Sequence, residues 1–222
     1  MKKPIKCIIF DCDGVLVDSE PISIGTIVQL ANEIGIDIDY DFGVRRFVGN
    51  SWENVANILA QKLGRPLPTN FEETYRTTSF ERFKKELTAV EGVLELLPQL
   101  KIPFCVASSG PPHKIRLNLQ LTGLLPYFEG HIYSCYDIQK WKPDPAIYQH
   151  AAQSMGFEPT DCLVIEDSLF GVQAGVASGC QVYAYAAMAP NKADLEEAGA
   201  ELFYEMTALP QLIKQKIIDQ NL

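Results

Sequence analysis

Basic residues are scarce in this sequence: 19 lysines and arginines stand against 28 aspartates and glutamates, for a formal net charge of −9. Proteins that bind nucleic acids or anionic membrane surfaces need positive patches, so both classes are disfavoured. No run of about 18 apolar residues occurs, which argues against a membrane-spanning helix. The apolar run near the N-terminus is too short for a signal peptide, and we expect a cytoplasmic protein.

Cysteine and histidine lack the spacings of metal and redox sites. The six cysteines contain no C-x-x-C pair and the three histidines no H-E-x-x-H pattern, so neither a zinc site nor a redox pair is predicted. We interpret the cysteines as buried free thiols in a reducing cytosol. Repeats and low-complexity segments are also absent, and 222 residues suit one domain or a core with a smaller insertion.

Short apolar runs that end in small or acidic residues are the main pattern present. They lie at 5–10, 104–107, 132–133, 163–165 and 182–186, and helix-like patterns at 112–122, 143–155 and 168–178 separate the later ones. Runs of this length suit strands buried on both faces of a parallel sheet. Their alternation with helices predicts a doubly wound α/β fold with a Rossmann-like parallel sheet.

One long interval between the first two runs breaks this alternation. Helices are predicted there at 19–34, 51–63 and 70–86, with Ser19 and Ser51 as N-caps and Gly35 and Gly64 beyond the helix ends. The interval is too long for a crossover connection. We therefore predict an inserted α-helical cap domain at 17–90, in an α/β core made of 1–16 and 91–222.

Two aspartates, Asp11 and Asp13, follow the first apolar run in the segment Asp11-Cys12-Asp13-Gly14. Ligands of open α/β sheets bind beyond the carboxyl ends of the strands, which is where this pair falls. Two carboxylates this close are costly unless a cation neutralises them or one is protonated. A strand that ends in an ordinary turn could also account for these two aspartates. The residues at the ends of the other strands therefore decide between a turn and a functional site.

The later strand ends carry complementary groups. Ser108 and Ser109 precede a helix N-terminus, which favours an anion, and Lys142 stands in a loop that prolines stiffen. Glu166 and Asp167 end another apolar run and supply the oxygen ligands of a hard cation. A cation site, an anion site and a carboxylate able to attack are what phosphoryl transfer to an aspartate requires.

Four segments together resemble the four motifs of the haloacid dehalogenase (HAD) superfamily: Asp11 to Ser19, Ser108, Lys142 to Pro145, and Glu166 to Ser168. The helical insertion is similar to the cap of subclass I, and the whole is closest in pattern to the β-phosphoglucomutase-like phosphatases. The resemblance implies a phosphoric monoester hydrolase that acts on a small phosphorylated metabolite, a sugar or sugar-acid phosphate such as 6-phosphogluconate. A monomer is expected, with no nucleic-acid or membrane partner.

The resemblance also implies residue roles. Asp11 would be the nucleophile that forms an aspartyl-phosphate, and Asp13 the general acid and base. Mg²⁺ would be held by the Asp11 carboxylate, the Asp13 carbonyl and Asp167, with Glu166 acting directly or through water. Phosphoryl oxygens would be bound by Ser108, Ser109 and Lys142. Candidate specificity residues are Arg45, Arg46, Asn50, Arg76 and Lys114.

Related chemistries are distinguished by single residues. Dehalogenating and phosphonate-cleaving relatives lack the second aspartate, so Asp13 disfavours both, and response-regulator receivers carry their acceptor on the third strand. A sugar-phosphate mutase would place a histidine near Ser23, and none is present in that helix. Hydrolysis is therefore preferred, and the mutase stays open as an alternative, with a non-catalytic binding protein as a remote one.

Overall fold

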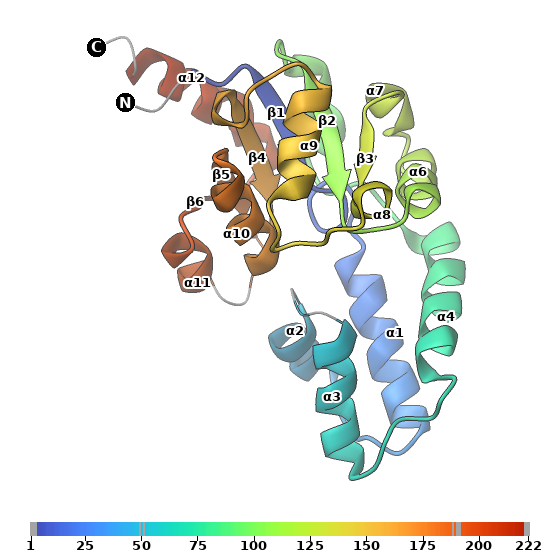
Figure 1. Ribbon diagram of the computed structural model, residues 1–222. Coiled ribbons are helices and arrows are strands. Elements are labelled where there is room, and N and C mark those ends of the chain that lie inside the picture. Colours follow the sequence, from blue (N-terminus) through green and yellow to red (C-terminus); the bar gives the residue numbers. More distant parts are fainter. Residues whose placement is uncertain (1–3, 49, 51, 188, 190–191, 220–222) are drawn as a thin grey trace. The chain divides into compact units, whose positions relative to one another are not determined.

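A parallel six-stranded sheet forms the centre of the α/β unit in the computed structural model, which describes residues 4–219 except 49, 51, 188 and 190–191. Its strands are β1 (Cys7–Phe10), β2 (Phe104–Ser108), β3 (Ile132–Ser134), β4 (Cys162–Glu166), β5 (Gln181–Tyr185) and β6 (Glu201–Phe203). They lie in the order β3-β2-β1-β4-β5-β6 (Figure 1). The predicted α/β parallel sheet is confirmed, and β6 is a short edge strand that the sequence analysis missed.

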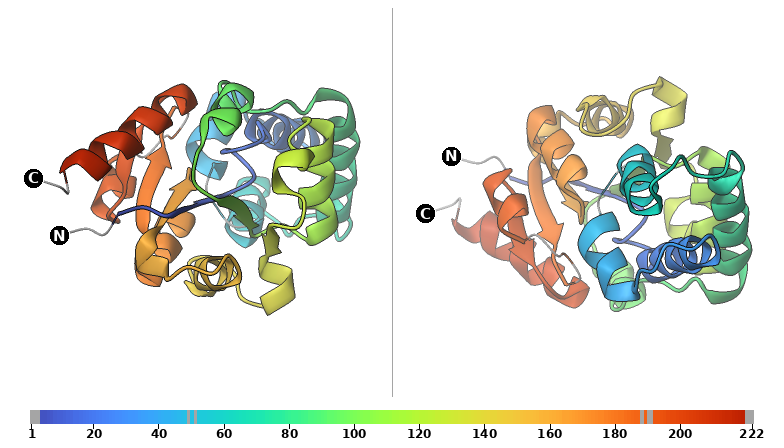
Figure 2. Two further views of the ribbon diagram at one scale, coloured as in Figure 1. Left: turned by 90° about the horizontal axis from the view of Figure 1, so that it is seen from above. Right: turned by 90° about the horizontal axis from the view of Figure 1, so that it is seen from below.

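Helices cover both faces of this sheet. They are α5 (Val93–Leu96), α6 (Pro112–Leu121), α7 (Leu125–Phe128), α8 (Cys135–Ile138), α9 (Ala146–Ser154), α10 (Leu169–Ser178), α11 (Lys192–Glu197) and α12 (Leu209–Asp219), with 3₁₀ turns at Leu97–Gln99, Pro159–Asp161 and Met206–Ala208. Figure 2 shows α12 on the opposite side of the sheet from α9 and α10. The fold is therefore doubly wound.

Alternation along each strand divides the core between the two faces. Ile9 and Val164 pack in one buried cluster with Ile147 of α9. Phe10 points the other way, and its ring meets Phe128 of α7 edge-on, with 6.2 Å between ring centroids. The strands are thus buried on both faces, as their continuous apolar runs predict. All six cysteines are buried and free, as the sequence predicts.

The chain separates into two compact units, residues 1–18 with 88–222 and residues 19–87. The predicted insertion, 17–90, extends slightly further at both ends. The difference has a local cause, because the two connecting segments bond to each other: Asp18 N–H donates to the Thr88 carbonyl at 2.9 Å, and Val90 N–H donates to the Leu16 carbonyl at 3.0 Å. These residues therefore belong to the sheet-containing unit.

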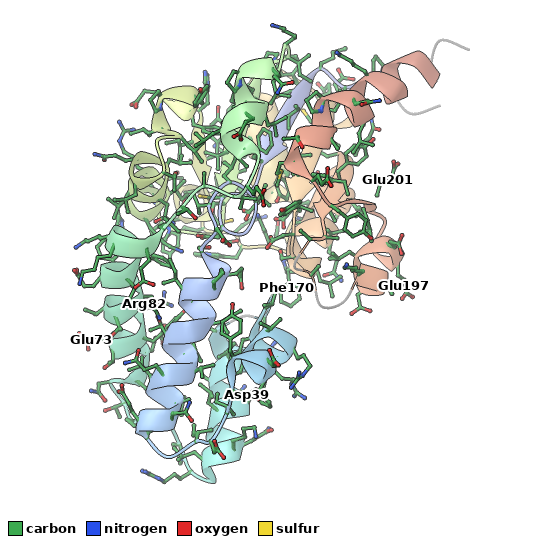
Figure 3. All side chains as sticks on the ribbon, turned by 180° about the vertical axis from the view of Figure 1, so that it is seen from behind. Asp39, Glu73, Arg82, Phe170, Glu197 and Glu201 are labelled. Atoms are coloured by element: carbon green, nitrogen blue, oxygen red, sulfur yellow. The ribbon has the colours of Figure 1, made fainter. Side chains whose placement is uncertain are left out.

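The described residues of the second unit form helices and no strand: α1 (Glu20–Glu33), α2 (Tyr40–Phe47), α3 (Trp52–Leu63) and α4 (Phe71–Glu86). Apolar side chains of all four helices form its core. Arg82 of α4, which is labelled in Figure 3, donates to Thr26 Oγ1 of α1 at 3.2 Å. Helix α2 was not predicted. Its central glycine, Gly43, hides the pattern, and a Cβ there would meet Ile24 Cγ2 at 2.6 Å.

The predicted helix starts differ from the structure in one cap and in one boundary. Ser19 precedes α1, but its side chain makes no capping hydrogen bond, and the predicted cap Ser51 lies outside the described residues. The helix predicted from 143 begins only at Ala146, whose N–H donates to Asp144 Oδ1 at 2.9 Å, because two prolines occupy the preceding turn. No helix in the described part of the chain is long and apolar enough to cross a membrane.

Candidate active site

The candidate site lies at the carboxyl edge of the sheet, where β1 is flanked by β2 and β4. Asp11 is the first residue beyond β1, and its N–H continues the sheet by donating to the Ile165 carbonyl at 2.9 Å. In register, Phe10 pairs with Val106 and with Ile165, so Asp11 lies level with the ends of both neighbouring strands. Along the sheet, β1 is followed by β2 on one side and β4 by β5 on the other, and ligands of open α/β sheets bind at such a switch point.

Lys142 connects the carboxylates that these strands present. Its Nζ donates to Asp11 Oδ1 and to Glu166 Oε1, each at 2.6 Å, and to the Ala107 carbonyl at 3.4 Å. Burial disfavours the charged lysine, but the two carboxylates outweigh this and hold the pKa of Lys142 well above its ordinary value. The buried ammonium group of Lys142 therefore compensates the charges of two buried carboxylates.

Asp11 remains the less well compensated of those anions. Burial raises the pKa of Asp11 to about 7; the charge of Lys142 opposes this rise, while Glu166 adds to it. An additional positive charge near Asp11 would stabilise its ionised form. The electrostatics of the site therefore favour a bound cation.

Glu166 is fully buried and satisfied by an unusually complete set of donors. Its Oε1 accepts from Lys142 and from the Tyr148 hydroxyl, both at 2.6 Å. Its Oε2 accepts from the backbone N–H groups of Asp167 and Ser168 and from Ser168 Oγ, at 2.9–3.0 Å. Burial opposes its ionisation, but Lys142 and the other donors hold the pKa of Glu166 below its ordinary value.

Oxygens of Asp11, Glu166 and Asp167 lie within 4.8 Å of one another and could hold a metal ion. Carboxylate oxygens are the ligands that hard cations such as Mg²⁺ prefer, so the donor chemistry fits this ion. Both Glu166 oxygens are already occupied by five donors, which leaves Asp11 and Asp167 as the better candidates for direct ligands. Asp167 lies against Gly14 (φ +78°), where a Cβ would overlap its carboxylate.

The end of β2 and the turn that leads to α6 carry Ser108 and Ser109, the serines predicted to bind phosphoryl oxygens. The buried Ser108 Oγ accepts from Gly110 N–H at 3.1 Å and so shapes the turn. Ser109 lies beside it, with its Oγ 3.8 Å from Cys135 Sγ. Helix α6 begins two residues after Gly110, and a helix N-terminus with flanking hydroxyls suits a phosphate group.

Asp13 accepts hydrogen bonds from two side chains of α6. Lys114 Nζ donates to Asp13 Oδ2 at 3.0 Å, and Asn118 Nδ2 donates to Asp13 Oδ1 at 3.3 Å. Lys114 was predicted as a specificity residue, and here it forms an ion pair with the predicted acid and base. The structure therefore places Asp11 and Asp13, each paired with a lysine, beyond the carboxyl end of β1.

The other predicted specificity residues lie in the helical unit. Arg45 and Arg46 are exposed in the last turn of α2, where positive charge suits the helix dipole. The exposed Asn50 donates to the Arg46 carbonyl at 2.9 Å. Arg76 pairs with Glu72 at 2.6 Å one helical turn away on α4. These contacts are local and assign no ligand.

Three residues of the site were missed by sequence reasoning. Tyr148 follows the helical pattern of α9 like any core residue, so nothing marks its hydroxyl. Gly171 lets the Glu166 carboxylate lie against α10, because a Cβ there would overlap it. Asn118 did carry a signal: it is a polar residue on the buried face of α6, beside Ile115 and Leu119.

The fold and the site together define a doubly wound α/β protein with an acidic centre beyond the carboxyl end of its first strand. The pattern of the haloacid dehalogenase-like hydrolases matches residues 5–179. The chain belongs to this family.

Individual relatives cover nearly the whole chain. The 6-phosphogluconate phosphatase of Escherichia coli is 36% identical over 213 residues, 96% of each chain. A haloacid dehalogenase-like protein of unknown function from Agrobacterium tumefaciens superposes with a TM-score of 0.90 at 32% identity, over 96% of this chain and 99% of that one. A HAD family hydrolase from Deinococcus radiodurans, solved with bound phosphate and sodium, has a TM-score of 0.80 at 30% identity over 93% of both chains.

Proposed function

We propose that this protein is a Mg²⁺-dependent phosphatase that hydrolyses a sugar or sugar-acid phosphate, 6-phosphogluconate being the first candidate. The observation that carries the proposal is the buried Asp11 carboxylate just beyond β1, in contact with Lys142 at 2.6 Å and two residues from Asp13. The name of the Escherichia coli relative, which matches this chain over 96% of its length, supports the substrate class.

In the proposed reaction, an Asp11 carboxylate oxygen attacks phosphorus while the bond from phosphorus to the sugar oxygen breaks. Asp13 donates a proton to that departing oxygen, so the sugar leaves as an alcohol. Asp13 then accepts a proton from water as the water oxygen bonds to phosphorus and the bond to Asp11 breaks. The products are the dephosphorylated sugar and inorganic phosphate, and Asp11 returns to a carboxylate.

The surrounding groups would make this attack by one anion on another possible. Lys142 offsets the charge of Asp11, and Ser108, Ser109 and the start of α6 bind phosphoryl oxygens. Mg²⁺, held by the carboxylates of Asp11 and Asp167 and the Asp13 carbonyl, would supply positive charge to the phosphoryl group. Glu166, which accepts five hydrogen bonds, orients Lys142 rather than binding the ion directly.

The helical unit 19–87 is proposed as the cap that selects the substrate. Its exposed Arg45 and Arg46 suit a carboxylate or phosphate, because guanidinium groups bind such anions with two parallel hydrogen bonds. Alanine at both positions should raise KM for sugar-acid phosphates more than for neutral sugar phosphates. The exposed Arg65, which belongs to no predicted site, is the matched control on the same unit.

The proposal is tested by phosphate release from a panel of sugar and sugar-acid phosphates, with Mg²⁺ and with EDTA. We expect Mg²⁺-dependent release concentrated on few compounds, and a loss of about three orders of magnitude in Asp11→Asn. Asp137→Asn, an exposed aspartate on α8, should retain full activity. Release that persists in EDTA or in Asp11→Asn would refute the mechanism.

The mutase alternative makes a different prediction in the same assay. A mutase would move phosphate between positions of a sugar with little free phosphate released. Helix α1 contains no histidine, with Ser23 where the resemblance would place one, and we therefore expect hydrolysis. Exchange of phosphate between sugars at a rate above hydrolysis would favour the mutase.

A further inference from the structure

Asn118 is a buried polar side chain that packing alone does not explain. It has no exposed surface and stands on the apolar face of α6, where a leucine would fit the pattern of Ile115 and Leu119. Its Oδ1 is buried and finds no hydrogen-bond partner among the described residues. A buried polar atom without a partner lowers stability, so the favourable polar contact of this side chain is the hydrogen bond that its other end makes.

That other end reaches the predicted acid and base. Asn118 Nδ2 donates to Asp13 Oδ1 at 3.3 Å, and Lys114 Nζ donates to Asp13 Oδ2 at 3.0 Å. Lys114 and Asn118 are four residues apart and so lie on the same face of one helix. Each carboxylate oxygen of Asp13 therefore has its own donor, and both donors are fixed to α6.

The stem of Lys114 is also confined. Its Cδ lies 3.8 Å from the point where a Cβ would stand at Gly110, in the turn that leads from Ser108 to α6. The lysine thus runs close to the turn proposed to bind phosphate on its way to Asp13. The turn and the start of α6 therefore carry both the proposed phosphate-binding residues and a donor to Asp13.

We propose that Lys114 and Asn118 are positioning residues, which hold the Asp13 carboxylate in the orientation that proton transfer requires. This inference rests on the proposed function, in which Asp13 gives a proton to the leaving alcohol and later takes one from water. General acid–base catalysis requires the donor oxygen within about 2.6–3.2 Å of its partner. Carboxylate oxygens have two lone pairs each, so Asp13 can accept both bonds and still reach the substrate.

The positioning role predicts a dependence on the leaving group. An alcohol needs a proton to depart, whereas p-nitrophenolate leaves without one. In Asn118→Leu, which removes the amide and keeps the size, we expect alcohol release from a sugar phosphate to fall about 10- to 100-fold. The first-turnover burst of p-nitrophenolate from p-nitrophenyl phosphate should stay within about twofold of the wild-type rate, and the melting temperature should not fall.

The slower second step provides an independent readout. An Asp13 carboxylate in the wrong orientation also activates water poorly, so Asn118→Leu should accumulate aspartyl-phosphate during turnover of p-nitrophenyl phosphate. Acid quenching with radiolabelled substrate detects this intermediate. Lys114→Met, which keeps an unbranched stem and removes the ammonium, should show the same pattern. Arg116→Gln is the matched control, because it removes only an exposed ion pair with Glu129 from the same helix.

Two results would overturn the inference. Equal slowing of the sugar phosphate and of p-nitrophenyl phosphate in the first turnover would indicate general damage to the site. Unchanged alcohol release in Asn118→Leu and Lys114→Met would show that their contacts with Asp13 do not contribute to catalysis. Asp13→Asn, measured in parallel, separates this failure from failure of the proposed function. If Asp13→Asn itself shows no leaving-group dependence, the acid role is wrong and the positioning role falls with it.

Discussion

Removing the Lys142 ammonium should destabilise the protein in a pH-dependent way. In Lys142→Met a comparable stem remains, but Asp11 and Glu166 lose the cation that lies 2.6 Å from an oxygen of each. Breaking a buried ion pair by removing one partner costs about 3–5 kcal/mol. For a chain of this size, each kcal/mol corresponds to about 2–4 °C, so we expect melting to fall by about 6–20 °C.

The pH dependence follows from proton uptake. Without the ammonium, the pKa values of the two carboxyls rise, so the folded state binds more protons than the unfolded chain and stability falls as pH increases. The gap between variant and wild type should therefore be wider at about pH 8 than at about pH 5.5. Urea and thermal unfolding in EDTA measure this directly.

A neighbouring lysine provides the control. Lys140→Met removes an exposed ammonium from the same loop, 3.6 Å from Asp144, and exposed pairs contribute about 0–1 kcal/mol. We expect this variant to melt like wild type at both pH values. If Lys142→Met were as stable as Lys140→Met, the assignment of Lys142 as the compensating charge of the buried carboxylates would be wrong.

Three further perturbations test the same electrostatics. Gly171→Ala should displace the Glu166 carboxylate and reduce both stability and phosphate release, whereas Gly25→Ala, where the nearest atom belongs to the flexible Arg82, should not. Tyr148→Phe removes one of five donors to Glu166 and should cost about 1.5–3 kcal/mol in urea unfolding. Burial raises the pKa of Asp11 from 3.8 to about 7. The folded, metal-free protein therefore binds a proton that the unfolded chain has lost, and its stability should fall as pH rises from about 4 to about 7. Asp11→Asn should flatten this dependence of stability on pH, and Mg²⁺ should oppose it.

Much of the core was predictable because its signals are local. Continuous apolar runs indicate strands buried on both faces of the sheet. The residues that follow these strands lie at one edge of any parallel sheet. This is why Asp11, Ser108 and Glu166 were predicted together although up to 155 positions separate them. The short edge strand β6 carries no comparable run, and α2 is masked by the glycine that lets it pack closely on α1.

Contacts between side chains were much less predictable. Lys114 was chosen as a positive charge near the phosphate turn, and only the structure pairs it with Asp13. The hydroxyl of Tyr148 and the amide of Asn118 act across the fold, on residues 18 and 105 positions away. Spacing within one segment does not encode such partners, since they arise from how α9 and α6 lie on the sheet.

Glu166 and Asp167 illustrate how adjacent acids acquire different tasks. As a sequence pair they are two equivalent oxygen ligands, but successive residues leave a strand on opposite sides. Glu166, the last residue of β4, turns into the protein and is saturated by Lys142, Tyr148 and the start of α10. Asp167 lies one step beyond, against Gly14 and among the oxygens around Asp11. The first acid therefore holds the lysine, and the second lies among the oxygens that could hold a metal ion, a difference that follows from the pleat of the strand.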